Sequence, residues 1–139
     1  MKDSNLNTYK TTLLFNLLFQ SLGKTKEEIL NTTPGEIIFD TDLSLEIRMD
    51  IANLGCEFED GVCVTSYLFF SRRRDIDIIK HYCDDTFVRI NYYSWHYMPK
   101  YSDTQYLIRY HQIKKVRKDD KSLKVFECLA DTISREVRK

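Results

Sequence analysis

His111 and Glu127 are the pair of residues in this 139-residue chain with the clearest potential for acid–base chemistry. They fall on two neighbouring predicted strands, and a pairing that sets them opposite each other would form a carboxylate-oriented general base. The same arrangement is typical of an ordinary cross-strand polar pair. Because no nucleophile is placed nearby, the polar pair is the favoured interpretation. A small enzyme centred on His111 and Glu127 stays an alternative.

The cysteines show no spacing typical of a metal site or a redox motif. All four lie in apolar stretches, where a free thiol behaves as a small hydrophobic group; they are Cys56, Cys63, Cys83 and Cys128. We expect them to be buried and reduced, which favours a cytoplasmic protein. Motifs for phosphate, dinucleotide, zinc or serine-hydrolase chemistry do not occur. The sequence therefore predicts no catalytic residue, metal or cofactor.

An aromatic segment from residue 86 to residue 130 is the strongest feature that points to binding. Aromatic residues on adjacent strands form a broad amphipathic surface of the kind that proteins use to hold another macromolecule. One predicted sheet face of this segment carries the candidate contact residues Tyr93, Trp95, Tyr97 and Arg109. The sequence leaves open whether this face or the opposite one is exposed.

Charge is distributed unevenly although the formal net charge is zero. Residues 35–61 contain eight acidic residues and one basic residue, whereas residues 100–139 contain eleven Lys and Arg against six Asp and Glu. The two blocks either face each other in the fold or form a dipolar surface that steers a charged partner. The acidic candidates for partner contact are Glu46, Asp50, Glu57, Glu59 and Asp60.

The first half of the chain reads as two helices followed by four strands. Leucines at helical spacing predict a helix over residues 8–22, and the capping box of Thr25 and Glu28 predicts a second, short helix. Strands are expected at 36–40, 43–51, 56–59 and 62–70. The last two flank Asp60 and Gly61, a strong signal for a tight hairpin with Phe58 opposite Cys63.

The second half reads as one helix, from residue 71 to about residue 82, followed by three long strands at 86–98, 104–116 and 122–130. Residues 130–139 are polar and are expected to form a frayed tail or a short helix. The order predicts a single α+β domain over residues 1–139, in which a twisted, mostly antiparallel sheet of about six or seven strands has helices on one face.

Turn lengths give a predicted register for the last three strands. A five-residue turn at 99–103 sets His96 opposite Tyr106 and Arg109 opposite Tyr93, which places His96 and His111 on opposite faces of the sheet. A turn at 117–121 sets His111 opposite Glu127. A slip by one residue would exchange the two faces.

These observations favour a non-catalytic protein-binding module, by analogy in size and surface chemistry with immunity proteins and other inhibitors that cap a toxin or nuclease. Binding would use the acidic strands or the aromatic face. A homodimer that closes on the aromatic face is compatible with this prediction. The apolar patch at residues 13–19 is too short to span a membrane, so no membrane association is expected.

Nucleic-acid binding is a second alternative, based on two basic clusters beside the aromatic segment. The clusters consist of Arg72, Arg73 and Arg74, and of Lys114, Lys115, Arg117 and Lys118. The sequence pI of about 6.8 and the acidic block argue against this interpretation.

Overall fold

The computed structural model describes residues 6–70, 72–100, 104–113 and 123–130. Within these residues, three helices and eight strands follow one another in the order ααββββαββββ. The helices are α1 (Thr8–Ser21), α2 (Lys26–Thr32) and α3 (Arg73–Thr86). The strands are β1 (Glu36–Asp40), β2 (Ser44–Arg48), β3 (Asn53–Glu59), β4 (Val62–Phe70), β5 (Val88–Asn91), β6 (Ser94–Tyr97), β7 (Tyr106–Ile113) and β8 (Leu123–Ala130).

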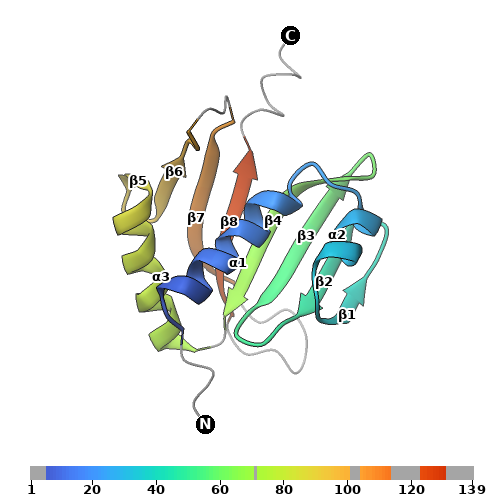
Figure 1. The fold of residues 1–139 in the computed structure, drawn as a ribbon, viewed down its shortest axis with the longest axis horizontal. Coiled ribbons are helices and arrows are strands. Elements are labelled where there is room, and N and C mark those ends of the chain that lie inside the picture. The colour runs from blue at the N-terminus through green and yellow to red at the C-terminus, as the bar shows by residue number, and fades with distance from the viewer. Residues whose placement is uncertain (1–5, 71, 101–103, 114–122, 131–139) are drawn as a thin grey trace.

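All eight strands form one antiparallel sheet in the order β1-β2-β3-β4-β8-β7-β6-β5. Each half of the chain forms a four-stranded meander, and the two meanders meet where β4 pairs with β8 (Figure 1). The three helices lie on the same face of the sheet (Figure 1). The predicted α+β fold, with an antiparallel sheet and a helix between the fourth and fifth strands, is confirmed.

Local sequence signals account for the ends of several elements. The Asn7 side chain accepts a hydrogen bond from the backbone N–H of Lys10 and caps α1. Thr25 and Glu28 form the predicted capping box of α2. Asp60 and Gly61 have φ values of 52° and 83°, as a tight hairpin turn between β3 and β4 requires, and Phe58 lies opposite Cys63 as predicted.

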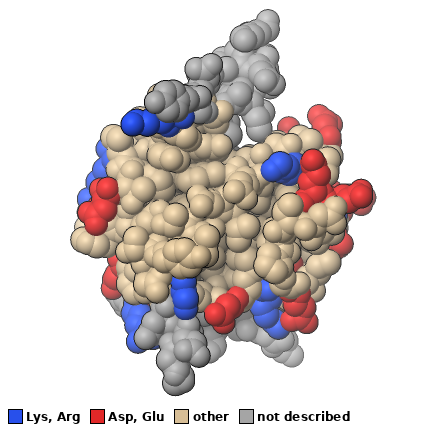
Figure 2. Space-filling model, viewed as in Figure 1, with Lys and Arg blue, Asp and Glu red and all other residues tan. Residues whose placement is uncertain are grey.

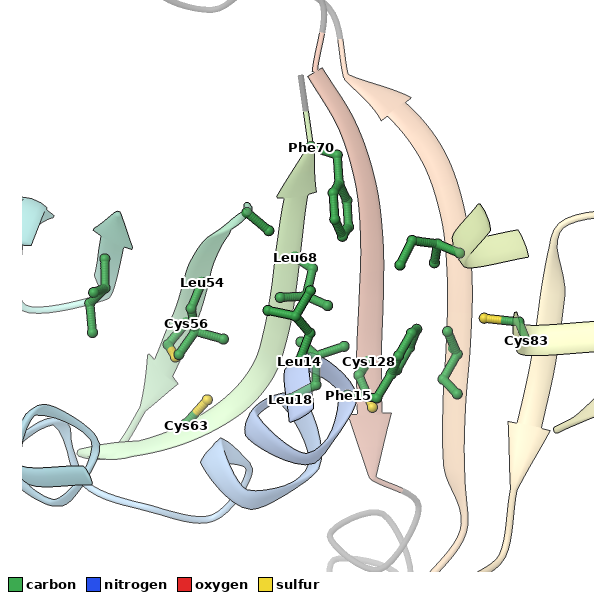
Figure 3. Close-up of a cluster of buried hydrophobic side chains, with 14 of the residues drawn as sticks. Leu14, Phe15, Leu18, Leu54, Cys56, Cys63, Leu68, Phe70, Cys83 and Cys128 are labelled. Atoms are coloured by element: carbon green, nitrogen blue, oxygen red, sulfur yellow. The ribbon is translucent and has the colours of Figure 1, made fainter. Parts of the chain in front are cut away.

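The hydrophobic core fills the space between the helices and the sheet. Leu14, Phe15 and Leu18 of α1 pack over the centre of the sheet, where Leu68 is fully buried (Figure 3). All four cysteines are buried and free within this core, as predicted. Among the described residues, the core cluster therefore lies on the helix-covered side of the sheet.

The predicted strand over residues 86–98 is wrong, because it is two short strands joined by a turn at Tyr92 and Tyr93. This division gives the sheet one strand more than the sequence predicted. The helix before it was predicted too short, since α3 continues from Arg73 to Thr86. Residues 131–139, for which a tail was predicted, lie outside the described part of the chain.

The predicted register between β6 and β7 is wrong by one residue. Trp95 pairs with Ile108 and Tyr97 pairs with Tyr106, so the side chains of β6 face the opposite way from the prediction. Trp95 is completely buried in the core. Its indole N–H donates to Asp84 Oδ1 at 2.8 Å, which satisfies the one polar atom of the buried ring.

The predicted register between β7 and β8 is wrong by two residues, which leaves the faces unchanged but changes the partners. Arg109 lies opposite Glu127, and His111 lies opposite Val125. His96 pairs with Leu107, so His96 and His111 occupy the same face rather than opposite faces. Their backbone positions are about 13 Å apart along the strand direction.

Candidate functional site

The sheet face opposite the helices, which we call the open face, is the principal candidate surface. No described helix packs against it, and its residues alternate with the core residues of the same strands. A row of paired positions crosses this face from β2 to β7. This central row consists of Glu46, Gly55, Tyr67, Glu127 and Arg109.

Gly55 at the centre of the row allows an aromatic ring to lie against the backbone of β3. A Cβ atom at this position would come within 2.4 Å of Phe69 Cε2, so the ring occupies the space that any other residue would need. The Tyr67 and Phe69 rings are stacked, with centroids 5.7 Å apart and an interplanar angle of 23°. Both side chains are half-buried, which leaves part of each ring accessible to a partner.

The Tyr67 hydroxyl lies among carboxylates. It donates a hydrogen bond to Glu57 Oε1 at 2.7 Å, and Glu127 lies directly opposite Tyr67 on β8. Burial, followed by the hydrogen bond and the negative charge of Glu57, raises the pKa of Tyr67 well above its ordinary value. Tyr67 is therefore a neutral hydrogen-bond donor rather than a base.

Arg109 is held by the mostly buried carboxylate of Glu127. Arg109 Nη2 and Nε donate to Glu127 Oε1 at 2.7 and 3.0 Å. The predicted pairing of His111 with Glu127 is therefore wrong, because Glu127 has Arg109 as its cross-strand partner.

Several acidic residues predicted to contact a partner carry charge that no cation neutralises within the described residues. Glu57 and Glu59 lie on the open face of β3, and Asp60 lies at the tip of the β3–β4 turn. Figure 2 shows acidic side chains gathered at the edge of the molecule that carries α2 and β1 to β3, on the right of the view. Acidic side chains are therefore concentrated at this edge on the side seen in the view.

The other two predicted acidic residues lie near this group. Glu46 is on the open face and accepts a hydrogen bond from Asn53 Nδ2 at 3.0 Å. Asp50 is exposed in the connection between β2 and β3. The structure therefore brings Glu46, Glu57 and Glu59 together on the open face, with Asp50 and Asp60 beyond opposite ends of β3.

The predicted aromatic contact surface does not exist as one surface. Trp95 is buried, and Tyr97 packs against the core between Phe19 and Phe87. Tyr93 is exposed at the β5–β6 turn, where it stacks on Tyr92. Only Arg109 of the four residues lies on the open face, and the aromatic residues at its centre are Tyr67 and Phe69 of β4.

Sequence reasoning missed Tyr67 and Phe69 as surface residues. They lie within the predicted strand 62–70, whose continuous apolar run is typical of a fully buried strand. Their alternation with Ser66, Leu68 and Phe70, which all face the core, was the available signal. The alternation alone does not tell which of the two sets of residues faces the core. The position of the helices on one face decides this.

Cysteine and metal chemistry receive no geometric support in the described residues. Hydrogen bonding with Cys63 and burial raise the pKa of the Cys56 thiol, and burial raises that of Cys83 and Cys128. Hydrogen bonding with Cys56 lowers the pKa of Cys63, but this thiol is completely buried and also donates to the Thr65 carbonyl. No group of three or more metal-ligating side chains occurs within the part of the chain that the structure describes.

The first basic cluster is partly engaged in the fold. Arg72 forms an ion pair with the buried Asp75 through Nε and Oδ2 at 2.9 Å. Arg74 is exposed on α3, and Lys114, Lys115, Arg117 and Lys118 lie outside the described residues. The alternative of nucleic-acid binding through both clusters therefore stays an untested prediction.

Comparison with known proteins gives no relative for this chain. No family model, no curated protein and no solved structure matches it significantly. In the described residues no helix is long and apolar enough to cross a membrane. The function must therefore be argued from the open face itself.

Proposed function

We propose that this chain is a non-catalytic protein-binding module of the inhibitor type, which binds a basic protein through the open face of its sheet. The observation that carries the proposal is a sheet face that no described helix covers and that carries Glu57 and Glu59, neither of which has an ion-pair partner among the described residues. A protein toxin or nuclease with a cationic active site has the complementary charge, which favours rapid and specific association.

The composition of the open face supports binding rather than catalysis. Half-buried aromatic rings surrounded by polar side chains are typical of the centre of protein interfaces. Glu57 and Glu59 flank this centre and would contact Lys or Arg side chains of the partner. Four free cysteines fit a cytoplasmic protein of the immunity or antitoxin kind.

Charge reversal combined with partner capture tests the proposal. The tagged full chain is used to capture proteins from nuclease-treated lysate of its source cells, and the retained proteins are identified by mass spectrometry. We expect one stoichiometric basic partner, retained at least about tenfold less by the double variant Glu57→Lys, Glu59→Lys. The matched control is Asp77→Lys, Asp85→Lys, which reverses two exposed charges on α3.

Equal retention of the partner by the Glu57→Lys, Glu59→Lys variant and the wild-type chain would contradict the proposal. Circular dichroism melting of both variants establishes that the fold is intact, since all four substituted side chains are exposed.

A further inference from the structure

The centre of the open face has the composition of a site for a single cationic side chain. Three carboxylates, those of Glu46, Glu57 and Glu127, lie on the same face as the Tyr67–Phe69 ring pair, and Arg109 pairs with Glu127. The ring pair and the carboxylates come from β2, β3, β4 and β8, so they converge only in the folded sheet. Negative charge beside partly exposed aromatic rings attracts a cation.

We propose that the open face binds an arginine side chain of the partner, with its guanidinium group stacked on the Tyr67–Phe69 ring pair and hydrogen-bonded to the Glu57 carboxylate. This inference rests on the proposed function, and it names the partner group that occupies the centre of the interface.

The geometry favours arginine over lysine for two reasons. A planar guanidinium group stacks on an aromatic ring and at the same time donates paired hydrogen bonds to a carboxylate, whereas an ammonium group is a compact, strongly hydrated point charge. The sheet already contains a guanidinium–carboxylate pair next to the site, where Arg109 donates two hydrogen bonds to Glu127 Oε1. Glu57 is the neighbouring carboxylate, and no cation pairs with it in the described residues.

The stacking of Phe69 over Gly55 also has a purely structural explanation. An aromatic ring that covers a glycine within a sheet protects the backbone and compensates for the missing side chain. That explanation accounts for the position of the Phe69 ring. It does not require the Glu57 carboxylate or the Tyr67 ring, so these two groups distinguish the binding role from the structural one.

Calorimetric titration of the full chain with hexa-arginine and hexa-lysine peptides, at low ionic strength, tests the proposal. We expect hexa-arginine to bind about threefold to tenfold more tightly than hexa-lysine. Tyr67→Leu should abolish this preference, whereas Tyr67→Phe, which retains the ring, should keep it. Glu57→Gln should weaken binding of both peptides, and the control Asp85→Asn should weaken neither.

Two results would overturn the arginine site. One is equal affinity of the wild-type chain for the two peptides, and the other is an unchanged arginine preference in a folded Tyr67→Leu variant. Either result leaves the proposed function standing if capture of the partner still depends on Glu57 and Glu59. If charge reversal at these two residues leaves capture intact, the proposed function itself fails. Melting curves of each variant show that a lost preference does not come from unfolding.

Discussion

The two faces of the sheet consist of alternate residues of the same strands, yet they differ in almost every physical property. On β4, Leu68 is completely buried beneath α1, while its neighbours Tyr67 and Phe69 lie half-buried on the open face. The covered face is apolar and close-packed, and the open face combines rings, carboxylates and a guanidinium group. The comparison indicates that the covered face maintains the fold, and it is the reason why we propose that a partner binds the open face.

The largest effect is expected on the covered face. Leu68→Ala removes a fully buried side chain beneath α1 and should lower the free energy of unfolding by about 2–5 kcal/mol, because it leaves a cavity in the core. Urea denaturation measures this loss. Phe69→Leu, one residue away on the open face, is the matched control and should cost less than about 1.5 kcal/mol. Equal losses in the free energy of unfolding for the two variants would contradict the view that the covered face contributes more to stability than the open face.

The next largest effect is expected from a substitution at the contact between Gly55 and the Phe69 ring, at the centre of the open face. Gly55→Ala should destabilise the protein by about 1–3 kcal/mol, because the new methyl group must displace the Phe69 ring. In a Phe69→Ala background the same change should cost nothing or be slightly stabilising, since alanine is preferred to glycine within a strand. A double-mutant cycle by urea denaturation measures this coupling. Additive effects of the two substitutions would mean that the ring does not lie over Gly55.

The sequence contained a local signal for one turn of the sheet but not for another. The β3–β4 hairpin and its register followed from Asp60 and Gly61, because the turn type requires residues that accept positive φ. The turn at Tyr92 and Tyr93 has no glycine or proline to mark it, so the strand over residues 86–98 was predicted without a break. With this break and the one-residue change in register, the candidate contact residue Trp95 lies in the core.

The candidate site was harder to predict than the fold. Tyr67 and Glu127 meet only because β4 pairs with β8, and the two strands are separated by more than fifty residues. Local patterns specify strands and turns, but they carry no information about which distant strands become neighbours. The acidic residues Glu46, Glu57 and Glu59 could be predicted as a group because they lie on adjacent strands joined by short connections.

A smaller effect concerns the hydroxyl group of Tyr67. Tyr67→Phe removes the hydrogen bond to Glu57 and should lower the free energy of unfolding by about 0.5–1.5 kcal/mol, towards the lower end because both groups contact solvent. Tyr92→Phe is the control, since the exposed Tyr92 hydroxyl makes no hydrogen bond within the described residues. Urea denaturation of both variants at neutral pH gives the comparison. If the Tyr67 variant were as stable as the control, the hydrogen bond would contribute nothing.

The smallest effect is a dependence of stability on alkaline pH. The pKa of Tyr67 is raised in the folded protein, chiefly by burial and then by Glu57. The unfolded chain therefore loses this proton first, so the stabilisation is complete below a pH of about 10 and declines as the pH rises above it. The Tyr67→Phe variant should lack this part of the decline. Urea midpoints measured between about pH 8 and 11 test this, and parallel declines in both proteins would contradict it.

The most direct test of the central proposal, that the open face contacts a basic partner, is carboxyl footprinting of the captured complex. The free chain and the complex are labelled with a carbodiimide and an amine, and modification of each Asp and Glu is quantified by mass spectrometry. The proposal predicts that Glu57 and Glu59 are protected in the complex, while Asp77 and Asp85 on α3 are labelled as in the free chain. Protection of Asp77 and Asp85 with unchanged labelling of Glu57 and Glu59 would show that the partner binds the helical side instead.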